Sequence, residues 1–274
     1  MRRDLGVPAD SHDASPELFD GQAAFFDRRT GLPEECCRAV AKKVVEFGGP
    51  RGLIIEVGCG TGQIGQWLEE TGRYVGFDFS VNMLASFWRR SDSPVIRADA
   101  NATWPFADGA ASVVFSSRTM HLLKHEHVAA EIFRVASAAG ATVLLGRVER
   151  TPGSVRERMA QELNERLRQR DLKGRRGERR NRRLFEACER LGAEVLEPVP
   201  VATWRTAASP QQSLDMWRGL TGLGGLLVSA ETKRKILNEL ETWALEAFGG
   251  LYEQFEFEET YVLSPFRVPP RRQP

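Results

Sequence analysis

The stretch that decides the fold is LIIEVGCGTGQIGQWL, residues 53–68. Its branched apolar run predicts a buried strand, and Gly58, Gly60 and Gly62 follow just before a helical pattern. Without side chains, these glycines let the backbone approach a ligand closely, and the next helix presents its first amide groups to that ligand. The stretch therefore predicts a strand, a ligand-binding turn and a helix.

The same alternation of short apolar runs and amphipathic stretches continues through the middle of the chain. It is typical of an α/β fold with a largely parallel sheet. The expected strands are 52–57, 73–78, 94–98, 111–116 and 141–147, and the expected helices are 33–47, 62–71, 81–91 and 126–138.

The pattern changes after Arg147, so we expect the chain to be one domain over residues 16–274 with a core at 50–148. Two helical patterns over 149–191 indicate a helical insertion. A sixth strand at 193–201, a late helical cap at 205–250 and a last strand at 253–263 should follow. Residues 1–15 are polar and interrupted by proline, which predicts a disordered tail.

Composition limits the class of partner. The 274 residues carry a formal charge of +1, so no overall field draws the chain to nucleic acid or to an anionic membrane. The four cysteines form no Cys-x-x-Cys pair, and the first residues lack the apolar run of a signal peptide or a membrane span. These features predict a cytoplasmic protein.

Three acidic residues near the glycine turn help to decide which ligand it binds. Taken alone, the turn has two other interpretations. Gly60 to Gly65 matches the dinucleotide-binding pattern GxGxxG, and the turn could also be an ordinary tight turn with a capping aspartate. Glu56 before the glycines, Asp78 at the end of the second strand and Asp99 after the third instead favour a sulfonium cofactor. A carboxylate after the second strand suits ribose hydroxyls, and one after the third suits an adenine amino group.

Four segments in order carry a resemblance to a known family: EVGCGTG, GFDFSVNML, RADANATWPFADGAASVVFSS and EIFRVASAAGATVLLGRV. In this order they resemble the class I S-adenosylmethionine-dependent methyltransferases, in the small-molecule branch with a methyltransferase type 11 core. The resemblance implies a Rossmann-like, mostly parallel sheet of seven strands with the last antiparallel, helices on both faces and a cap of helical insertions.

The resemblance also implies S-adenosylmethionine as the cofactor and assigns its contacts. The glycine loop should hold the methionine part, Asp78 the ribose, Phe79 and Met83 the adenine face, and Asp99 and Ala100 the adenine edge. Ser116 and Ser117 should lie beside the methyl group. The expected cofactor residues are Glu56, Gly58, Cys59, Gly60, Thr61, Gly62, Asp78, Phe79, Met83, Asp99, Ala100 and Ser116.

Methyl transfer needs alignment more than acid–base chemistry, so a base is optional. His121, just after the fourth strand, is the candidate base, although it can equally pack beneath the cap. Arg118 in the same loop is the candidate anchor for a substrate carboxylate or phosphate, or it pairs with a surface acid. The spacing of His121, His125 and His127 only partly suits a metal, so no metal site is expected.

The acceptor site should lie beyond the carboxyl ends of the strands. Several aromatic side chains are available for this site, which favours a small hydrophobic or aromatic acceptor. Oxygen is preferred as the methylated atom only because O-methylation is common among such enzymes. For each candidate residue, the alternative is an ordinary place in the hydrophobic core. The candidate substrate residues are Phe26, Trp204, Trp217, Arg218 and Tyr261.

A basic stretch from Arg156 to Arg183 holds 12 basic and five acidic residues. Such a stretch suits an RNA or protein methyltransferase. Two absences count against a nucleic-acid substrate. After the fourth strand the sequence reads SSRT, where a DNA amino-methylating enzyme carries an Asn/Asp-Pro-Pro-aromatic loop, and no aromatic residues alternate with the arginines to stack on bases. The stretch can instead pair with the acidic residues 231–260, within one chain or across a homodimer. A third alternative is a non-catalytic binding or scaffold protein.

Overall fold

The computed structural model describes residues 27, 31–49, 52–68, 73–172, 177–220 and 222–271. The expected tail at 1–15 and the candidate substrate residue Phe26 lie outside these residues.

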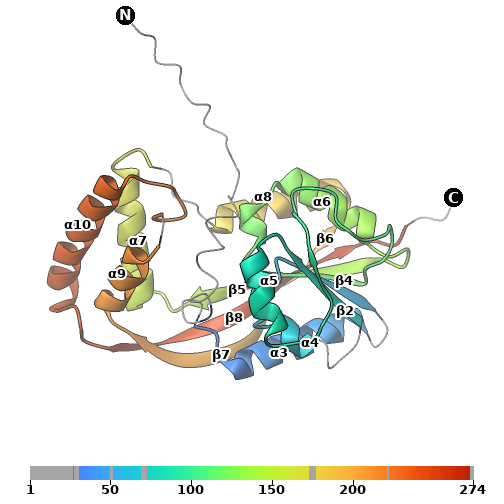
Figure 1. Cartoon of the computed structure of the whole chain (residues 1–274), viewed down its shortest axis with the longest axis horizontal. Helices are drawn as coiled ribbons and strands as arrows, with labels where there is room; N and C mark the ends of the chain where they lie inside the picture. Colours follow the sequence, from blue (N-terminus) through green and yellow to red (C-terminus); the bar gives the residue numbers. More distant parts are fainter. Residues whose placement is uncertain are drawn as a thin grey trace, which may run out of the picture.

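A mixed sheet forms the centre of the molecule (Figure 1). Strands β3, β2, β1, β4 and β5 are parallel in that order, and β8 lies antiparallel beside β5. Both β6 and β7 pair with the far side of β8. The strand bounds are β1 Leu53–Val57, β2 Arg73–Asp78, β3 Val95–Arg97, β4 Val113–Ser117, β5 Ala141–Arg150, β6 Glu194–Val195, β7 Val199–Ala208 and β8 Phe255–Val268.

This order confirms the predicted Rossmann-like sheet with an antiparallel C-terminal strand, but the described sheet has eight strands instead of seven. The expected sixth strand is divided into β6 and β7. Pro198 and Pro200 have no amide hydrogen to donate to a neighbour, and the register shifts between Pro200 and Ala202. The prolines therefore interrupt what the apolar pattern predicts as one strand.

Helices cover both faces of the sheet. The helices α3 (Glu34–Gly48), α4 (Gly65–Leu68) and α5 (Val81–Trp88) bury apolar side chains against one face, around Val40, Leu68 and Phe87. On the other face, α6 (His125–Val135) and α8 (Gly177–Arg190) pack Ile132 and Leu184 into a second core. Figure 1 shows these two layers below and above the sheet.

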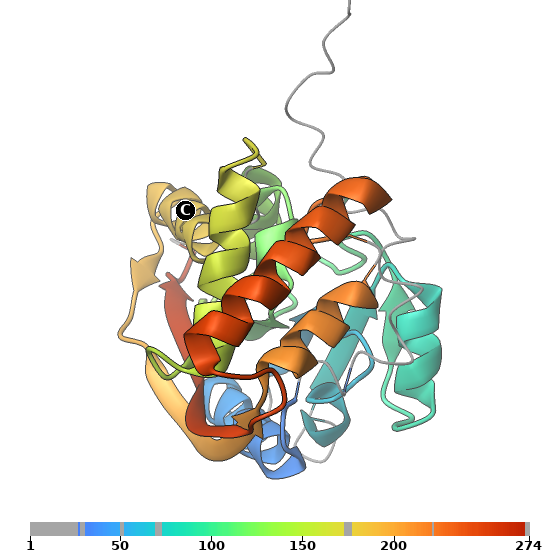
Figure 2. The same ribbon diagram turned by 90° about the vertical axis from the view of Figure 1, so that its left-hand side faces the viewer.

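A separate lobe of three helices packs around its own core. The helices α7 (Val155–Arg168), α9 (Pro210–Arg218) and α10 (Ala230–Phe248) lie next to one another in Figure 2, and Met159, Leu214 and Leu240 are buried between them. The expected insertion at 149–191 is thus shared between two places: α7 belongs to this lobe, whereas α8 covers the sheet. None of the helices described is both long and apolar enough to cross a membrane.

The lobe stands beyond the carboxyl edge of the parallel strands. The chain leaves the carboxyl end of β5 and enters α7 within a few residues, and β7 and β8 connect the sheet to α9 and α10 (Figure 1). Ligands of open α/β sheets bind at this edge. The lobe is therefore placed to cover a ligand that lies on the glycine loop.

The central strands approach closely at Gly146 on β5. A Cβ atom at this position would lie 1.9 Å from the hydroxyl oxygen of Tyr261 on β8, which itself donates a 2.7 Å hydrogen bond to Ser117 Oγ. Tyr261 is fully buried. The missing side chain of Gly146 therefore makes the room that Tyr261 occupies.

We expect Gly146→Ala to lower the free energy of unfolding by about 1–3 kcal/mol, because the Tyr261 ring must move within a packed core. Chemical denaturation of both proteins measures the change. Gly250→Ala is the control, since a Cβ there meets nothing within 4 Å. Adding Tyr261→Phe should recover part of the loss, and a Gly146→Ala variant as stable as the wild type would contradict the prediction.

Candidate functional site

The glycine loop is held at its two ends and open in the middle. Gly58, Gly60 and Gly62 have positive φ angles of 69°, 56° and 79°, which favour glycine. A Cβ at Gly58 would lie 2.4 Å from Thr119 atoms, and one at Gly62 would lie 2.7 Å from the Phe87 ring. A Cβ at Gly60 would meet nothing within 4 Å. Gly60 is thus the point where another molecule can reach the backbone.

Asp78 lies at the carboxyl end of β2, directly beside this open point. Its carboxylate accepts hydrogen bonds from the backbone N–H of Gly60 at 3.0 Å and from that of Ser80 at 2.9 Å. Phe77 O, one residue earlier, accepts the N–H groups of Gly58 and Cys59. The end of β2 and the glycine loop therefore form one unit, with an acidic group at the open point.

Glu56 is buried beneath the loop. Its Oε2 accepts a 2.6 Å hydrogen bond from the hydroxyl of Tyr74 on β2, and the residue is only 3% exposed. Burial raises the pKa of Glu56 to about 8; the Tyr74 hydrogen bond opposes this rise, and the Asp78 charge adds to it. Cys59 is buried nearby, and burial raises the pKa of its thiol as well.

The segment after β3 supplies the third predicted acid. Asp99 is exposed, and its Oδ1 accepts the N–H of Asn101 at 2.8 Å. Ala100 is buried and its carbonyl accepts the indole N–H of Trp104 at 3.1 Å. Because β2 and β3 are parallel neighbours, Asp78 and Asp99 follow adjacent strand ends at the same edge.

The predicted adenine-face residues flank the N-terminus of α5. Phe79 is half-buried, and Met83 is buried in the first turn of the helix. The side chain of Ser80 caps this helix by accepting the N–H of Met83 at 3.2 Å. The cap fixes where α5 begins relative to Asp78.

Asp27 contacts the loop from the N-terminal side. Its Oδ1 accepts a 2.6 Å hydrogen bond from Thr61 Oγ1, and its other oxygen forms an ion pair with Arg90. Asp27 was not predicted from the sequence, because nothing local to an aspartate near the chain start indicates a partner 34 residues away.

The end of β4 brings together the residues expected near the methyl group. Ser116 Oγ donates to Val57 O at 2.9 Å, and Ser117 Oγ accepts the Tyr261 hydroxyl. Arg118 has a positive φ of 60°, an uncommon conformation for a residue with a side chain. Burial lowers the pKa of its guanidinium, which lies near Tyr261 and Cys37. Arg118 is therefore turned inward from the strand end.

The structure describes the histidines of this loop only in part. His121 lies in a short 3-10 helix (Met120–Leu122), and its side chain is outside the described part of the structure. His127 Nε2 lies 2.8 Å from Ala102 O on the surface. Among the described residues, no group of three or more His, Cys, Asp or Glu side chains could hold a metal ion.

The remaining substrate candidates occupy different environments. Trp204 on β7 is half-buried, and its indole nitrogen has no hydrogen-bond partner among the described residues. Trp217 is buried in the core of the lobe. Arg218 forms ion pairs with Asp215 and Glu241 on the lobe surface. Of the candidates that the structure describes, Trp204 and Tyr261 lie on the strands that extend from the sheet edge.

A buried carboxylate lies next to these two residues and was not predicted. Glu259 on β8 is 3% exposed and is paired in register with Trp204 on one side and Arg150 on the other. Both of its oxygens accept Arg156 Nη1, at 3.1 and 3.2 Å. Glu259 thus binds the start of α7 to the sheet, where the lobe meets the core.

The first part of the basic stretch, in and just after α7, forms ion pairs within the chain. Arg156 contacts Glu259, Arg166 contacts Glu162 at 2.7 Å, and Arg170 contacts Glu239 of α10 at 2.5 Å. These ion pairs include the expected pairing with the acidic residues 231–260, and they occur inside one chain. They leave fewer charges for a nucleic acid.

The chain also matches known proteins in this region. Residues 55–144, which contain the glycine loop and the acids after β2 and β3, match the family model described as a methyltransferase domain. Residues 55–144 therefore form an S-adenosylmethionine-dependent methyltransferase domain. The open backbone at Gly60, with an acidic side chain beside it, fits this cofactor.

Solved structures share the fold of this methyltransferase. One is a proposed type II methyltransferase from Anaeromyxobacter dehalogenans, with 19% identity and a TM-score of 0.56 over 86% of this chain and 97% of that one. Another is the 4+2 cyclase SpnF, with 16% identity and a TM-score of 0.55 over 96% and 99%. A proposed methyltransferase from Bacillus halodurans C-125 has 16% identity and a TM-score of 0.53 over 84% and 98%. No curated protein sequence matches the chain.

We expect Glu56→Gln to change how stability depends on pH. The folded pKa of Glu56, about 8, lies above its ordinary value of 4.5, so its contribution to stability is complete below pH 4.5 and is lost as pH rises to about 8. Each pH unit in this window costs up to about 1.4 kcal/mol. Glutamine does not titrate, so the variant should gain Tm relative to the wild type from pH 5 to 8.

Thermal melts at several pH values measure this gain. Glu246→Gln, at an exposed glutamate of α10, controls for the loss of one charge. A Tm difference between wild type and Glu56→Gln that stays constant with pH would show that Glu56 is ionised in the folded protein.

Proposed function

We propose that this methyltransferase transfers a methyl group from S-adenosylmethionine to a small apolar or aromatic acceptor, with oxygen as the preferred attacking atom. The observation that carries the proposal is the position of the lobe. It stands beyond the carboxyl edge of the sheet, so an acceptor at the glycine loop lies between two packed bodies. A large RNA or protein surface suits such a covered edge less well.

We infer that the cofactor lies across the strand ends. The open backbone at Gly60 and the buried Glu56 support the methionine part, and Asp78 holds the ribose hydroxyls. At the other end, Asp99 meets the adenine amino group, since Asn101 occupies only one of its carboxylate oxygens among the described residues. This order follows the edge from β1 to β3.

The acceptor then lies on the β4 side, next to Ser117 and Tyr261. Burial raises the pKa of the Tyr261 hydroxyl, which donates to Ser117 and is therefore neutral. Arg118 is the nearby cation, so an acceptor oxygen that carries or develops negative charge is favoured there. Alignment of acceptor and methyl group in a site that excludes water supplies the rate, with bound S-adenosylmethionine providing the activated methyl group.

The cofactor placement predicts that Asp78→Asn raises the Kd for S-adenosylhomocysteine by about 10–100-fold, because two charge-assisted hydrogen bonds to the ribose are weakened. Titration calorimetry measures the Kd. Asp215→Asn, a matched change on the lobe surface, should bind as the wild type does. An unchanged Kd in Asp78→Asn would place the ribose elsewhere.

The acceptor class is tested with labelled S-adenosylmethionine and aromatic compounds that share one ring system and differ in one group: phenol, carboxylic acid, amine or thiol. We expect transfer to the phenol or the acid. Transfer to the amine or thiol alone would correct the attacking atom. Methylation of added RNA but of no small acceptor would overturn the proposal.

A further inference from the structure

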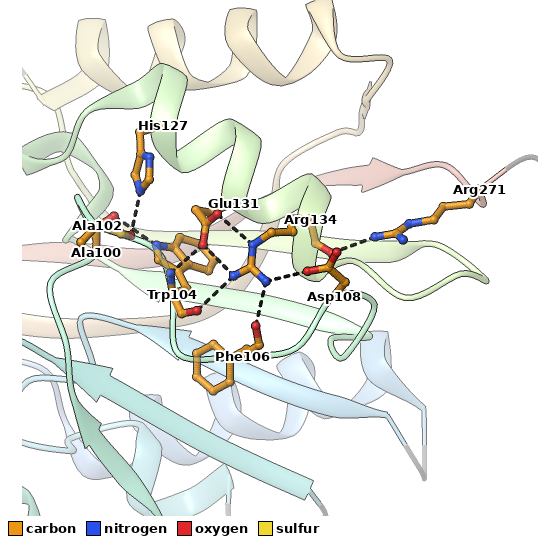
Figure 3. Close-up of polar contacts among 9 residues, drawn as sticks. All are labelled: Ala100, Ala102, Trp104, Phe106, Asp108, His127, Glu131, Arg134 and Arg271. Atoms are coloured by element: carbon orange, nitrogen blue, oxygen red, sulfur yellow. Dashed lines mark hydrogen bonds and ion pairs between the residues drawn. The ribbon is translucent and has the colours of Figure 1, made fainter.

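One face of α6 follows the loop between β3 and β4 (Figure 3). His127, Glu131 and Arg134 are spaced by four and three residues, so their side chains share this face of the helix. His127 contacts Ala102 O, and the two other residues contact the chain further along the loop. The helix therefore holds the loop at successive turns.

Glu131 and Arg134 clamp the loop at Trp104. The buried Glu131 accepts the backbone N–H of Trp104 at 2.6 Å, and Arg134 donates to Trp104 O at 3.0 Å. Arg134 also donates to Phe106 O at 2.8 Å and to the Asp108 carboxylate at 2.9 Å. The carboxylate of Glu131 thus holds the N–H of Trp104, and the guanidinium of Arg134 holds its carbonyl.

The two side chains depend on each other. Arg134 donates to both oxygens of Glu131, at 2.9 and 2.7 Å. The hydrogen bond from Arg134 lowers the pKa of Glu131, and the bonds to Glu131 and Asp108 raise that of Arg134. The pair is therefore charged at neutral pH. Removing one charge leaves the other partly buried without its main partner.

Trp104 connects Glu131 and Arg134 to the ends of strands β2 and β3. Its ring is 2% exposed and packs on Phe77, with ring centroids 5.4 Å apart, directly before Asp78. Its indole N–H holds the carbonyl of Ala100 at 3.1 Å, next to Asp99. The chain of contacts runs from α6 through Trp104 to the two predicted adenine-edge residues.

We propose that Glu131 and Arg134 are positioning residues for adenine recognition, which act through Trp104 to fix Asp99 and Ala100. This proposal rests on the adenine placement given above. The pair does not touch the cofactor. Its loss should weaken discrimination at the adenine edge more than it weakens binding of the rest of the cofactor.

The test compares two probes by titration calorimetry, at a temperature where every variant is folded. S-adenosylhomocysteine carries the adenine amino group, and S-inosylhomocysteine carries a carbonyl oxygen there, which repels a carboxylate. The wild type should prefer the first by about tenfold, the effect of one hydrogen bond to a charged group. Glu131→Gln should reduce this preference to about threefold or less.

Glu126→Gln is the matched control. It makes the same change on the same helix, at an exposed residue that pairs with Arg190 and has no contact with Trp104. It should keep the wild-type preference. If Glu131→Gln weakens both probes equally and keeps the preference, the pair has only a structural role and the proposal is overturned.

Two further variants distinguish a failure of this proposal from a failure of the adenine placement on which it rests. Trp104→Phe keeps an aromatic ring and removes the hydrogen bond to Ala100; it should also lower the preference, and it replaces Glu131→Gln if that variant does not fold. Asp99→Asn tests the placement itself. If Asp99→Asn keeps the wild-type preference, the adenine placement fails, whatever Glu131→Gln does.

Discussion

The structure depends on a steric constraint at the glycine loop. Thr119, after β4, fills the place of a side chain at Gly58, and Phe87, on α5, fills that at Gly62. These neighbours can pack against the loop only while both positions are glycine, and they come from opposite sides of β1. The constraint links the two sides of the glycine loop, because Thr119 follows β4 and Phe87 belongs to the helix that follows β2.

Local patterns in the sequence predicted much of this arrangement. Strand and helix periodicity gave the parallel core, and the three acids could be placed because the carboxyl ends of parallel strands share one edge. The position of α8 was not predictable in this way. Its many arginines suggest an exposed insertion, whereas Leu184, Ala187 and Cys188 form a narrow apolar stripe that covers the sheet.

Other features required knowledge of pairing over long distances. The left-handed backbone of Arg118 and its inward position depend on α3 and β8, which are remote in sequence. Glu131 and Arg134 read as an ordinary charged pair on a helix, and only the fold brings Trp104 between them. Trp217 was a plausible residue of the substrate site, but the sequence alone does not show which of the hydrophobic cores an aromatic side chain joins. Its role toward a substrate stays a prediction, as do those of Phe26 and His121.

The long strand β8 has a mechanical consequence. It has 14 residues; its first part pairs with β7 beside the lobe, and its last part pairs with β5 and β6 in the central sheet. The β7–β8 ribbon therefore joins α9 and α10 to the central sheet through continuous backbone hydrogen bonds. Any displacement of these two helices relative to the sheet has to bend or twist the ribbon. Residues along β8, far from the glycine loop, thus set how stiffly the two parts are joined.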